Sequence, residues 1–276
     1  MELYFIRRLL YILLNIHDDL LSILWLTENI GGNMLLLTNE DGTLKAKKIK
    51  RIIAISLMIC FLLSVAIPTV SAGSTKTYGI DISKWQKGMD LAKAKNEGVK
   101  FVIIRGMYGN EKDTSFDTHY KNAKAAGLKV GAYQYTRAVN AAQAREEAKL
   151  FISKCLKGKQ FEYPIYIDVE DNTLQKLSKN QVDAIITAWC DEMEKAGYFA
   201  GFYCNDNWFK NEMNGAELMK KYTYWNANWN TITTKYPMQQ FSGGTKKVAG
   251  MNCDQDYCYI DFPLIIVNGG FNGYKK

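Results

Sequence analysis

From residue 77 onward, short apolar runs alternate with longer amphipathic segments. The short runs have the length of β-strands and lie at 78–83, 101–107, 129–136, 164–170 and 200–204. Between them, apolar side chains recur at the spacing of one helical face, at 90–98, 116–127, 140–158 and 178–197. The last of these segments opens with a capping-box pattern, Ser178 to Gln181, and ends at Gly197. Strands that alternate with helices predict parallel βαβ units with right-handed crossovers.

After residue 204 this alternation changes. Three more strand-like runs follow, at 222–229, 238–242 and 253–259, with little room for helices between them. Eight strands are enough to close a barrel, and an open, doubly wound sheet is the alternative. We favour a TIM-like (β/α) barrel because DISKWQKG, after the first strand, lacks the glycine spacing of a dinucleotide-binding loop. In such barrels the active site lies at the carboxyl ends of the strands.

A different pattern occupies residues 1–72. Residues 45–51 read KAKKIKR, an apolar run follows, and the small residues Val70-Ser71-Ala72 come after Pro68. This order predicts a secretory signal peptide at 45–72, and an uncleaved signal-anchor that would hold the protein on the membrane is the alternative. Either one places the barrel, 73–276, outside the cell. We assign no function to the extension at 1–44, because its apolar run is interrupted by charges and translation could start at Met34.

Composition limits the classes of function. The chain is 47% hydrophobic, enough for a sizeable core, and its net charge of +7 would attract polyanionic surfaces. The lysines are spread along expected helix faces rather than interleaved with aromatic side chains, which favours a solvated basic surface over nucleic-acid binding. Five cysteines follow the predicted signal peptide, an odd number without zinc-type spacing, so neither a disulfide framework nor a metal site is indicated. We expect a monomer without a cofactor.

Carboxylates are the credible acid–base groups of the exported part. This part contains one histidine, His119, within an expected helix, which weakens serine- and cysteine-hydrolase triads. In PIYIDVED, 164–171, side chains alternate along an apolar strand, so Asp168 and Glu170 share one face. Same-face neighbours stand about 6.5–7 Å apart at the backbone, and each carboxylate raises the pKa of the other. Such a pair suits a general acid that stays protonated near neutral pH, with an ion pair to Arg105 as the alternative.

Further candidate groups belong to the same end of the expected barrel. Asp81 lies near the end of the first strand, whereas Asp254 lies at the start of the last one. Asp254 can therefore join the others only through a bend or an antiparallel final strand. Aromatic rings crowd these strands, and rings near acids suit the apolar faces of sugars, although any one ring can simply fill the barrel. The rings assigned to substrate binding are Tyr133, Tyr203 and Trp225. Together these residues indicate a carboxylate-driven enzyme that acts on glycans.

Six stretches then occur in the order typical of one enzyme family. They read YGIDISKWQ, FVIIRGMYG, GLKVGAYQYTRA, YPIYIDVED, FAGFYC and DQDY. In this order they resemble the glycoside hydrolase family 25 lysozymes, also called Chalaropsis-type muramidases. The specific part is the opening G-x-D-x-S-x-x-Q, formed by Gly79, Asp81, Ser83 and Gln86, together with a D-x-E on a later strand. A D-x-E alone would be a weak signal.

The resemblance implies a modified barrel with eight strands and fewer than eight helices. It also implies that peptidoglycan glycan strands are the substrate, cleaved at the β-1,4 bond between N-acetylmuramic acid and N-acetylglucosamine. Glu170 would protonate the leaving oxygen, and Asp168 would assist the substrate's N-acetyl group as it attacks the anomeric carbon. Direct water attack with inversion is the alternative. Asp81 and Asp254 match two further pocket aspartates of the family.

Two other functions stay open on the same barrel. One is a non-catalytic cell-wall glycan-binding module, against which the four intact acids argue. The other is a chitinase-like glycosidase, against which the opening motif argues. The chain also departs from the family pattern, because Gln239-Gln240-Phe241 stands where the family commonly has W-Q-Y. A stacking platform for sugar would then be lost or supplied elsewhere.

Overall fold

A closed β-barrel forms the centre of residues 76–275, the part of the chain that this computed structural model describes. The sheet order is β1-β9-β8-β7-β6-β5-β4-β2-β3, and a parallel pairing of β1 with β2 closes it, leaving β3 as a short appended strand. Parallel pairs connect β1 to β2 and run from β2 through β4 to β8, whereas β9 is antiparallel to both of its neighbours. The strands are β1 Thr77–Ile82, β2 Phe101–Tyr108, β3 Glu111–Lys112, β4 Lys129–Tyr135, β5 Ile165–Asp168, β6 Ala200–Asn205, β7 Thr223–Ala227, β8 Met238–Val248 and β9 Met251–Cys258.

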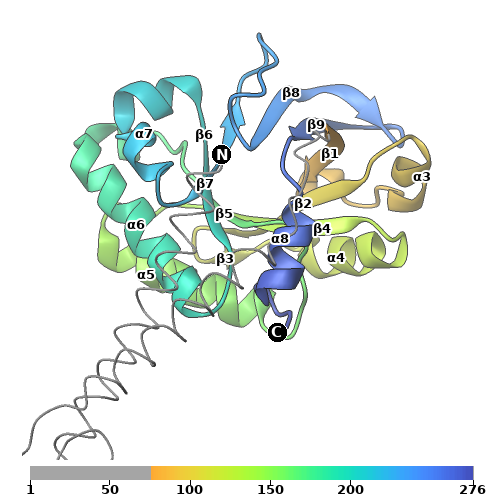
Figure 1. Cartoon of the computed structure of the whole chain (residues 1–276), viewed down its shortest axis with the longest axis horizontal. Coiled ribbons are helices and arrows are strands. Elements are labelled where there is room, and N and C mark those ends of the chain that lie inside the picture. Colours follow the sequence, from red (N-terminus) through yellow and green to blue (C-terminus); the bar gives the residue numbers. More distant parts are fainter. Residues whose placement is uncertain (1–75, 276) are drawn as a thin grey trace, which may run out of the picture. The chain divides into compact units, whose positions relative to one another are not determined.

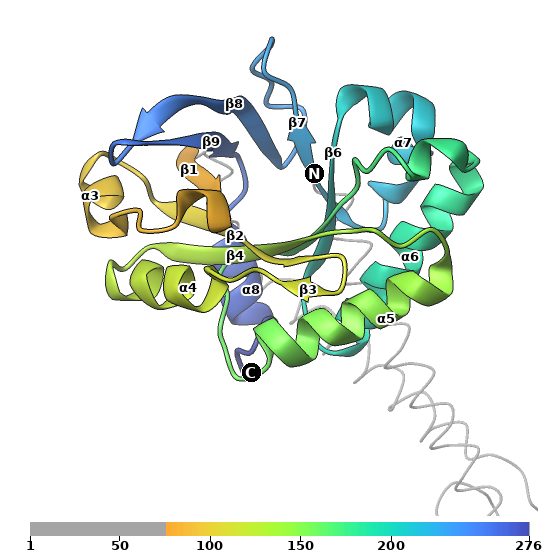
Figure 2. The same ribbon diagram turned by 180° about the vertical axis from the view of Figure 1, so that it is seen from behind.

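Helices cover only part of the barrel. Figure 1 and Figure 2 show α4, α5 and α6 along the outside of the sheet, whereas β8 and β9 form a hairpin with no helix between them. The α-helices of the described residues are α3 Leu91–Asn96, α4 Phe116–Ala125, α5 Ala141–Phe151, α6 Lys179–Lys195, α7 Gly215–Leu218 and α8 Phe262–Gly269. Short π-helical turns are Ile152–Leu156 and Trp208–Glu212, and 3-10 turns are Lys84–Gln86 and Leu174–Lys176. This is a modified TIM-like barrel, as predicted, and the closing β1–β2 pair excludes the open sheet.

The sequence alternation explains how the strands pack. On β1, Ile80 and Ile82 point outward into the apolar layer shared with the helices, whereas Gly79 and Asp81 point toward the barrel interior. The face of α6 that packs on the sheet consists of Val182, Ile185, Ile186, Trp189 and Met193, all buried. Its capping box is formed as predicted, with the backbone N–H of Ser178 donating to Gln181 Oε1 at 2.9 Å.

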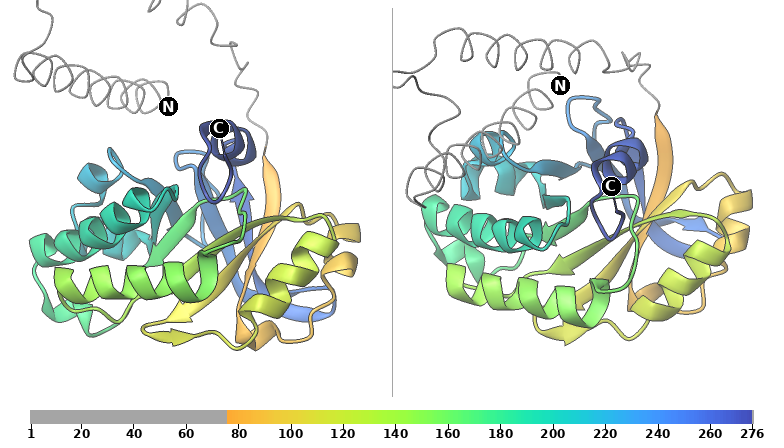
Figure 3. Two further views of the ribbon diagram at one scale, coloured as in Figure 1. Left: turned by 90° about the horizontal axis from the view of Figure 1, so that it is seen from below. Right: turned by 60° about the horizontal axis from the view of Figure 1, so that its bottom comes forward.

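The C-terminal segment closes the amino end of the barrel, opposite the carboxyl ends of the parallel strands. Helix α8 lies at the end of the barrel where β1 begins (Figure 3). Phe262 on α8 packs edge-on against Tyr163 and Phe199, which precede β5 and β6, with ring centroids 5.9 Å apart in both pairs. No helix was expected at 262–269, because the run FPLIIVNG carries no polar face to give a helical period.

The N-terminal predictions, an extension at 1–44 and a signal peptide or anchor at 45–72, lie outside the described residues. Among the helices at 76–275, none combines the length and apolar character needed to cross a bilayer. The cysteines of this part are buried, and no disulfide joins any two of them: Cys155, Cys190, Cys204, Cys253 and Cys258.

Candidate active site

The predicted carboxylates lie at the carboxyl ends of the parallel strands. Asp168 is the last residue of β5, and Asp81 is the fifth residue of β1. The register of the antiparallel pair β1–β9 places Asp254 directly opposite Asp81. The final strand therefore has the orientation that Asp254 needs to join the other acids. Glu170 lies two residues beyond the end of β5 rather than within the strand, because β5 is shorter than predicted.

Asp168 and Glu170 occupy different environments. The Asp168 side chain is buried, and its Oδ1 has no hydrogen-bond partner. Burial raises the pKa of Asp168 well above the usual range, and the nearby charge of Glu170 raises it further. Glu170 is exposed as a residue, yet the surrounding protein desolvates its carboxyl enough to raise its pKa, with added repulsion from Asp254 and Asp171. The two carboxyls repel each other when both are ionised, so the pair as a whole keeps a proton to higher pH than an ordinary carboxyl does.

Arg105 does not form the ion pair with these carboxylates that was the structural alternative. Its Nε donates to Asp113 Oδ2 at 2.9 Å, and its Nη2 lies 2.9 Å from the same oxygen. Asp113 follows in the loop after β3 and also accepts the backbone N–H groups of Lys84 and Ser115. The Arg105 charge still reaches Asp168 and opposes the rise of its pKa. Asp168 therefore lies within reach of the Arg105 charge, while its Oδ1 has no hydrogen-bond donor.

Asp256 is a further buried acid that the sequence analysis missed. It shares the inner face of β9 with Asp254 and is completely buried, and Trp225 Nε1 donates to its Oδ1 at 2.8 Å. Its Oδ2 has no hydrogen-bond partner, and its carboxyl interacts with that of Asp81, where a hydrogen bond can form only when one of the two acids carries a proton. Burial raises the pKa of Asp81 and of Asp256 well above the usual range. The D-x-D spacing of 254 and 256 was the signal that could have found it.

Gln240 connects the acids to the aromatic side chains at this end. Its Nε2 donates to Asp81 Oδ2 at 2.9 Å, and its Oε1 accepts from Tyr203 Oη and from Trp229 Nε1, each at 3.0 Å. The Trp229 residue is 63% exposed, so it presents a free indole face next to the acids. The departure from W-Q-Y suggested that a stacking platform for sugar is lost or supplied elsewhere. The exposed ring of Trp229 is an aromatic surface that could supply it.

The three rings assigned to substrate binding lie at different depths. Tyr133 and Tyr203 are 9% and 7% exposed, whereas Trp225 is 1% exposed. Burial raises the pKa of both tyrosines, and the charges of Asp81, Asp168 and Asp254 raise them further. Trp225 lies edge-on to Tyr203, with centroids 4.6 Å apart, and its polar contact is with a buried acid. A direct contact of Trp225 with substrate stays a prediction.

His119 has a structural environment. It lies on α4 and is buried. Its Nε2 is 3.1 Å from the backbone oxygen of Ser83, and this contact connects α4 to the loop after β1. Burial lowers the pKa of its ring. His119 therefore helps to position the loop after β1 and does not face the acids as a base.

The comparisons with known proteins agree with this geometry. The sequence profile of the glycosyl hydrolases family 25 matches residues 80–249. The chain belongs to this family. Lysozyme M1 of Streptomyces globisporus is 27% identical over 203 residues, which are 67% of this chain and 68% of that protein. The solved CTP1L endolysin superposes with a TM-score of 0.61 at 24% identity and covers 70% of each chain. The modular autolysin LytC from Streptococcus pneumoniae gives a TM-score of 0.59 at 23% identity, over 67% of this chain and 47% of that one.

As a family 25 member the chain is a glycoside hydrolase. Glycoside hydrolysis needs a proton donor to the leaving oxygen and a group that stabilises or attacks the anomeric carbon. The acids at the barrel end offer both kinds of group, since several of them hold protons at pH values where ordinary carboxyls are ionised. Within residues 76–275, no three histidine, cysteine or acidic side chains are grouped so as to hold a metal ion.

Proposed function

We propose that this hydrolase is a muramidase that cleaves the β-1,4 bond between N-acetylmuramic acid and N-acetylglucosamine in peptidoglycan. Family membership and the likeness to Lysozyme M1 support the substrate class. The structure of the modular autolysin LytC was determined in complex with a synthetic peptidoglycan ligand, which supports peptidoglycan as the substrate class. In this proposal Glu170 is the general acid, Asp168 assists, and Asp81 and Asp254 contact the substrate.

The open Oδ1 of buried Asp168 is the observation that carries this proposal. A buried carboxylate oxygen without a donor is costly, and a ligand that brings an N–H group would remove that cost. The N-acetyl group next to the scissile bond carries such an N–H. When the N–H donates to Asp168, it favours the ionised form of this acid and orients the acetamido oxygen toward the anomeric carbon. Glu170, with a raised pKa and an exposed position, then has the proton that the leaving oxygen requires.

The direct test is hydrolysis of purified peptidoglycan by the wild-type protein and by Glu170→Gln. We expect the variant to lose roughly 10²–10⁴-fold in rate, because the amide cannot donate the proton. Mass spectrometry of the wild-type products should show reducing ends of N-acetylmuramic acid. Glu217→Gln, an exposed acid on α7 that pairs with Lys220, is the matched control and should keep full activity.

The same assay separates the two alternatives. A protein that binds the wall but releases no fragments, with or without Glu170, is a binding module. A protein that cleaves chitin oligomers faster than peptidoglycan is a chitinase-like glycosidase. Either result contradicts the muramidase proposal.

The stereochemistry tests the role of Asp168. Attack by the N-acetyl oxygen, followed by water, retains the β configuration, whereas direct water attack inverts it. NMR of the first product formed should therefore show the β-anomer, and initial release of the α-anomer would rule out the substrate-assisted route.

We also propose that the enzyme works outside the cell, as a secreted or wall-associated monomer. The support is the basic, apolar and small-residue order of 45–72. N-terminal sequencing of the protein from culture medium should begin at Gly73. Retention of the whole chain in the membrane fraction would instead identify a signal-anchor.

A further inference from the structure

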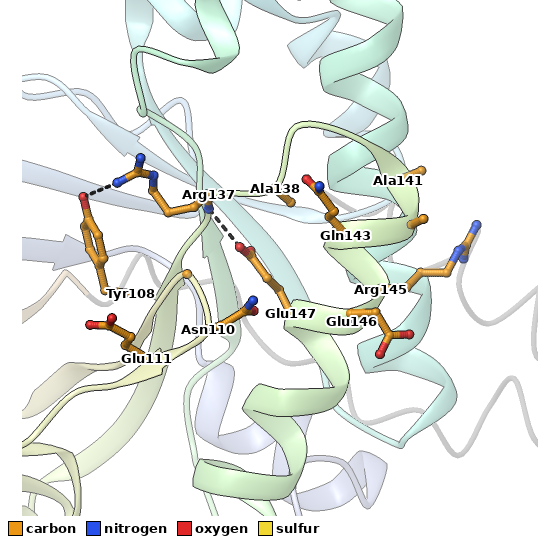
Figure 4. Close-up of a pocket in the computed structure, with 12 residues that line it drawn as sticks. Tyr108, Asn110, Glu111, Arg137, Ala138, Ala141, Gln143, Arg145, Glu146 and Glu147 are labelled. Carbon is orange, nitrogen blue, oxygen red and sulfur yellow. Dashed lines mark hydrogen bonds between the residues drawn. The ribbon is translucent and has the colours of Figure 1, made fainter.

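A second feature lies beside the acids and does not include them. An open recess of about 950 Å³ lies between the end of β2, the loop after β4 and the start of α5. Figure 4 shows the side chains that line it, chiefly Tyr108, Arg137, Gln143, Arg145, Glu146 and Glu147. Its volume is that of pockets that enclose drug-sized ligands, which is room for a short peptide.

One wall of the recess connects directly to the acid loop. Arg137 Nη1 donates to Tyr108 Oη at 3.0 Å, and Tyr108 stacks on Tyr135 with ring centroids 4.7 Å apart. Arg137 Nε lies 3.2 Å from Asp171 Oδ2, and Tyr135 Oη donates to the same oxygen at 3.2 Å. Asp171 is the residue after Glu170. A ligand on this wall would therefore lie next to the group that protonates the glycan.

Buried contacts hold the recess in shape. Glu147, 3% exposed, accepts the Thr136 hydroxyl at 2.7 Å and the Arg137 backbone N–H at 3.0 Å, and Figure 4 shows the second bond. These bonds fix the loop after β4 so that the Arg137 guanidinium lies against Tyr108. Gly109 has a φ of +53°, and a Cβ there would lie 3.0 Å from the Arg137 side chain. Ala138 and Ala141 leave the remaining space open.

Charges of both signs surround this space. Arg137 and Arg145 are cationic, and the exposed Glu111 and Glu146 are anionic. Such a lining suits a ligand that itself carries carboxylates and an amine. A neutral sugar would use neither charge, and a polyanion would be repelled by the glutamates. A short peptide with acidic groups and a free diamino-acid amine would complement both the arginines and the glutamates.

We propose that this recess binds the peptide stem attached to the muramic acid at the cleavage site. The inference rests on the proposed function, since only peptidoglycan presents a short charged peptide beside the glycan bond. Arg137 takes a carboxylate of the stem while Tyr108 packs against its backbone, and the exposed glutamates face its amine. The recess then contributes to recognition of natural peptidoglycan and contributes nothing to recognition of bare glycan.

The test uses two substrates made from the same wall. One is glycan that carries its stems, and the other is the same glycan after an amidase has removed them. Arg137→Gln should lower kcat/KM about tenfold on the first substrate and less than twofold on the second. Ala141→Phe fills the recess without changing Arg137 and should show the same dependence on the stem. Lys93→Gln, which removes an exposed cation from α3, is the matched control and should change neither rate.

The other possible results contradict either the stem site alone or the muramidase proposal as well. Equal losses on both substrates for Arg137→Gln would mean that Arg137 acts through Asp171 on the acid, and would overturn the recess as a stem site. Unchanged rates for both variants would overturn it as well. A wild type that cleaves neither substrate would overturn the muramidase proposal itself, and the stem site with it.

Discussion

Asp254 shows how burial couples a single side chain of the site to the stability of the whole fold. Burial raises its pKa to about 6, and a backbone hydrogen bond from Gly244 limits the rise. In the unfolded chain the same group would titrate near its ordinary value, so between about pH 4 and pH 6 the folded state binds more protons. Stability attributable to Asp254 is therefore highest below about pH 4 and falls as the pH rises to 6.

Asp254→Asn should remove this penalty. The amide is similar in shape, and its oxygen can still accept the Gly244 N–H. At pH 7.5 we expect the free energy of unfolding to rise by on the order of 1–2 kcal/mol, with little change at pH 4. Urea denaturation at the two pH values measures the difference. An equal effect at both pH values would show that packing, rather than ionisation, separates the variants.

Among the barrel strands, the opening G-x-D motif also has a packing cause. Gly79 on β1 pairs with Phe101 on β2, and a Cβ at position 79 would lie 2.3 Å from the Phe101 ring. The ring thus occupies the space above the glycine and fills the barrel interior between the two strands that close it.

Gly79→Ala should therefore destabilise the protein by about 1–3 kcal/mol through overpacking. Phe101→Leu also costs stability alone, because it removes buried ring volume. Together the two changes should cost less than the sum of the separate losses, since the smaller side chain makes room for the methyl group. A double-mutant cycle by urea denaturation measures this coupling, and strictly additive losses would contradict the contact.

The order of these elements was predictable because it depends on local periods. The alternation of β5 and the helical face of α6 are both properties of neighbouring residues, and both were confirmed. The strand alternation also predicted that Asp168 and Glu170 share a face; the charge of Glu170 does act on Asp168, although Glu170 lies beyond the end of β5. Long-range contacts were not predictable in this way. Gln240 bonds to Asp81 across 159 positions, and no local period indicates that contact.

At the scale of the whole barrel, the two ends differ in structure. The acids occupy the carboxyl ends of the parallel strands, and the C-terminal segment closes the other end. Asn272 is the main polar contact of that closure and is completely buried. Its Oδ1 accepts the Phe199 N–H at 2.7 Å, and its Nδ2 donates to the Tyr163 oxygen at 2.8 Å. It thereby joins the chain before β5 to the chain before β6.

Asn272→Ala should cost about 2–5 kcal/mol, because the buried Phe199 N–H and Tyr163 oxygen both lose their partners. Asn272 also has a φ of +54°, which alanine adopts less readily than asparagine. Asn272→Gly separates the two causes, since glycine tolerates this φ and makes neither side-chain bond. If the hydrogen bonds dominate, both variants should unfold at clearly lower urea concentration than the wild type. The activity of the folded fraction should be unchanged in both, because the acids lie at the opposite end of the barrel. If the glycine variant were as stable as the wild type, the stability lost in the alanine variant would come from backbone strain instead. Reduced activity of either variant in its folded state would show that the two ends of the barrel are coupled.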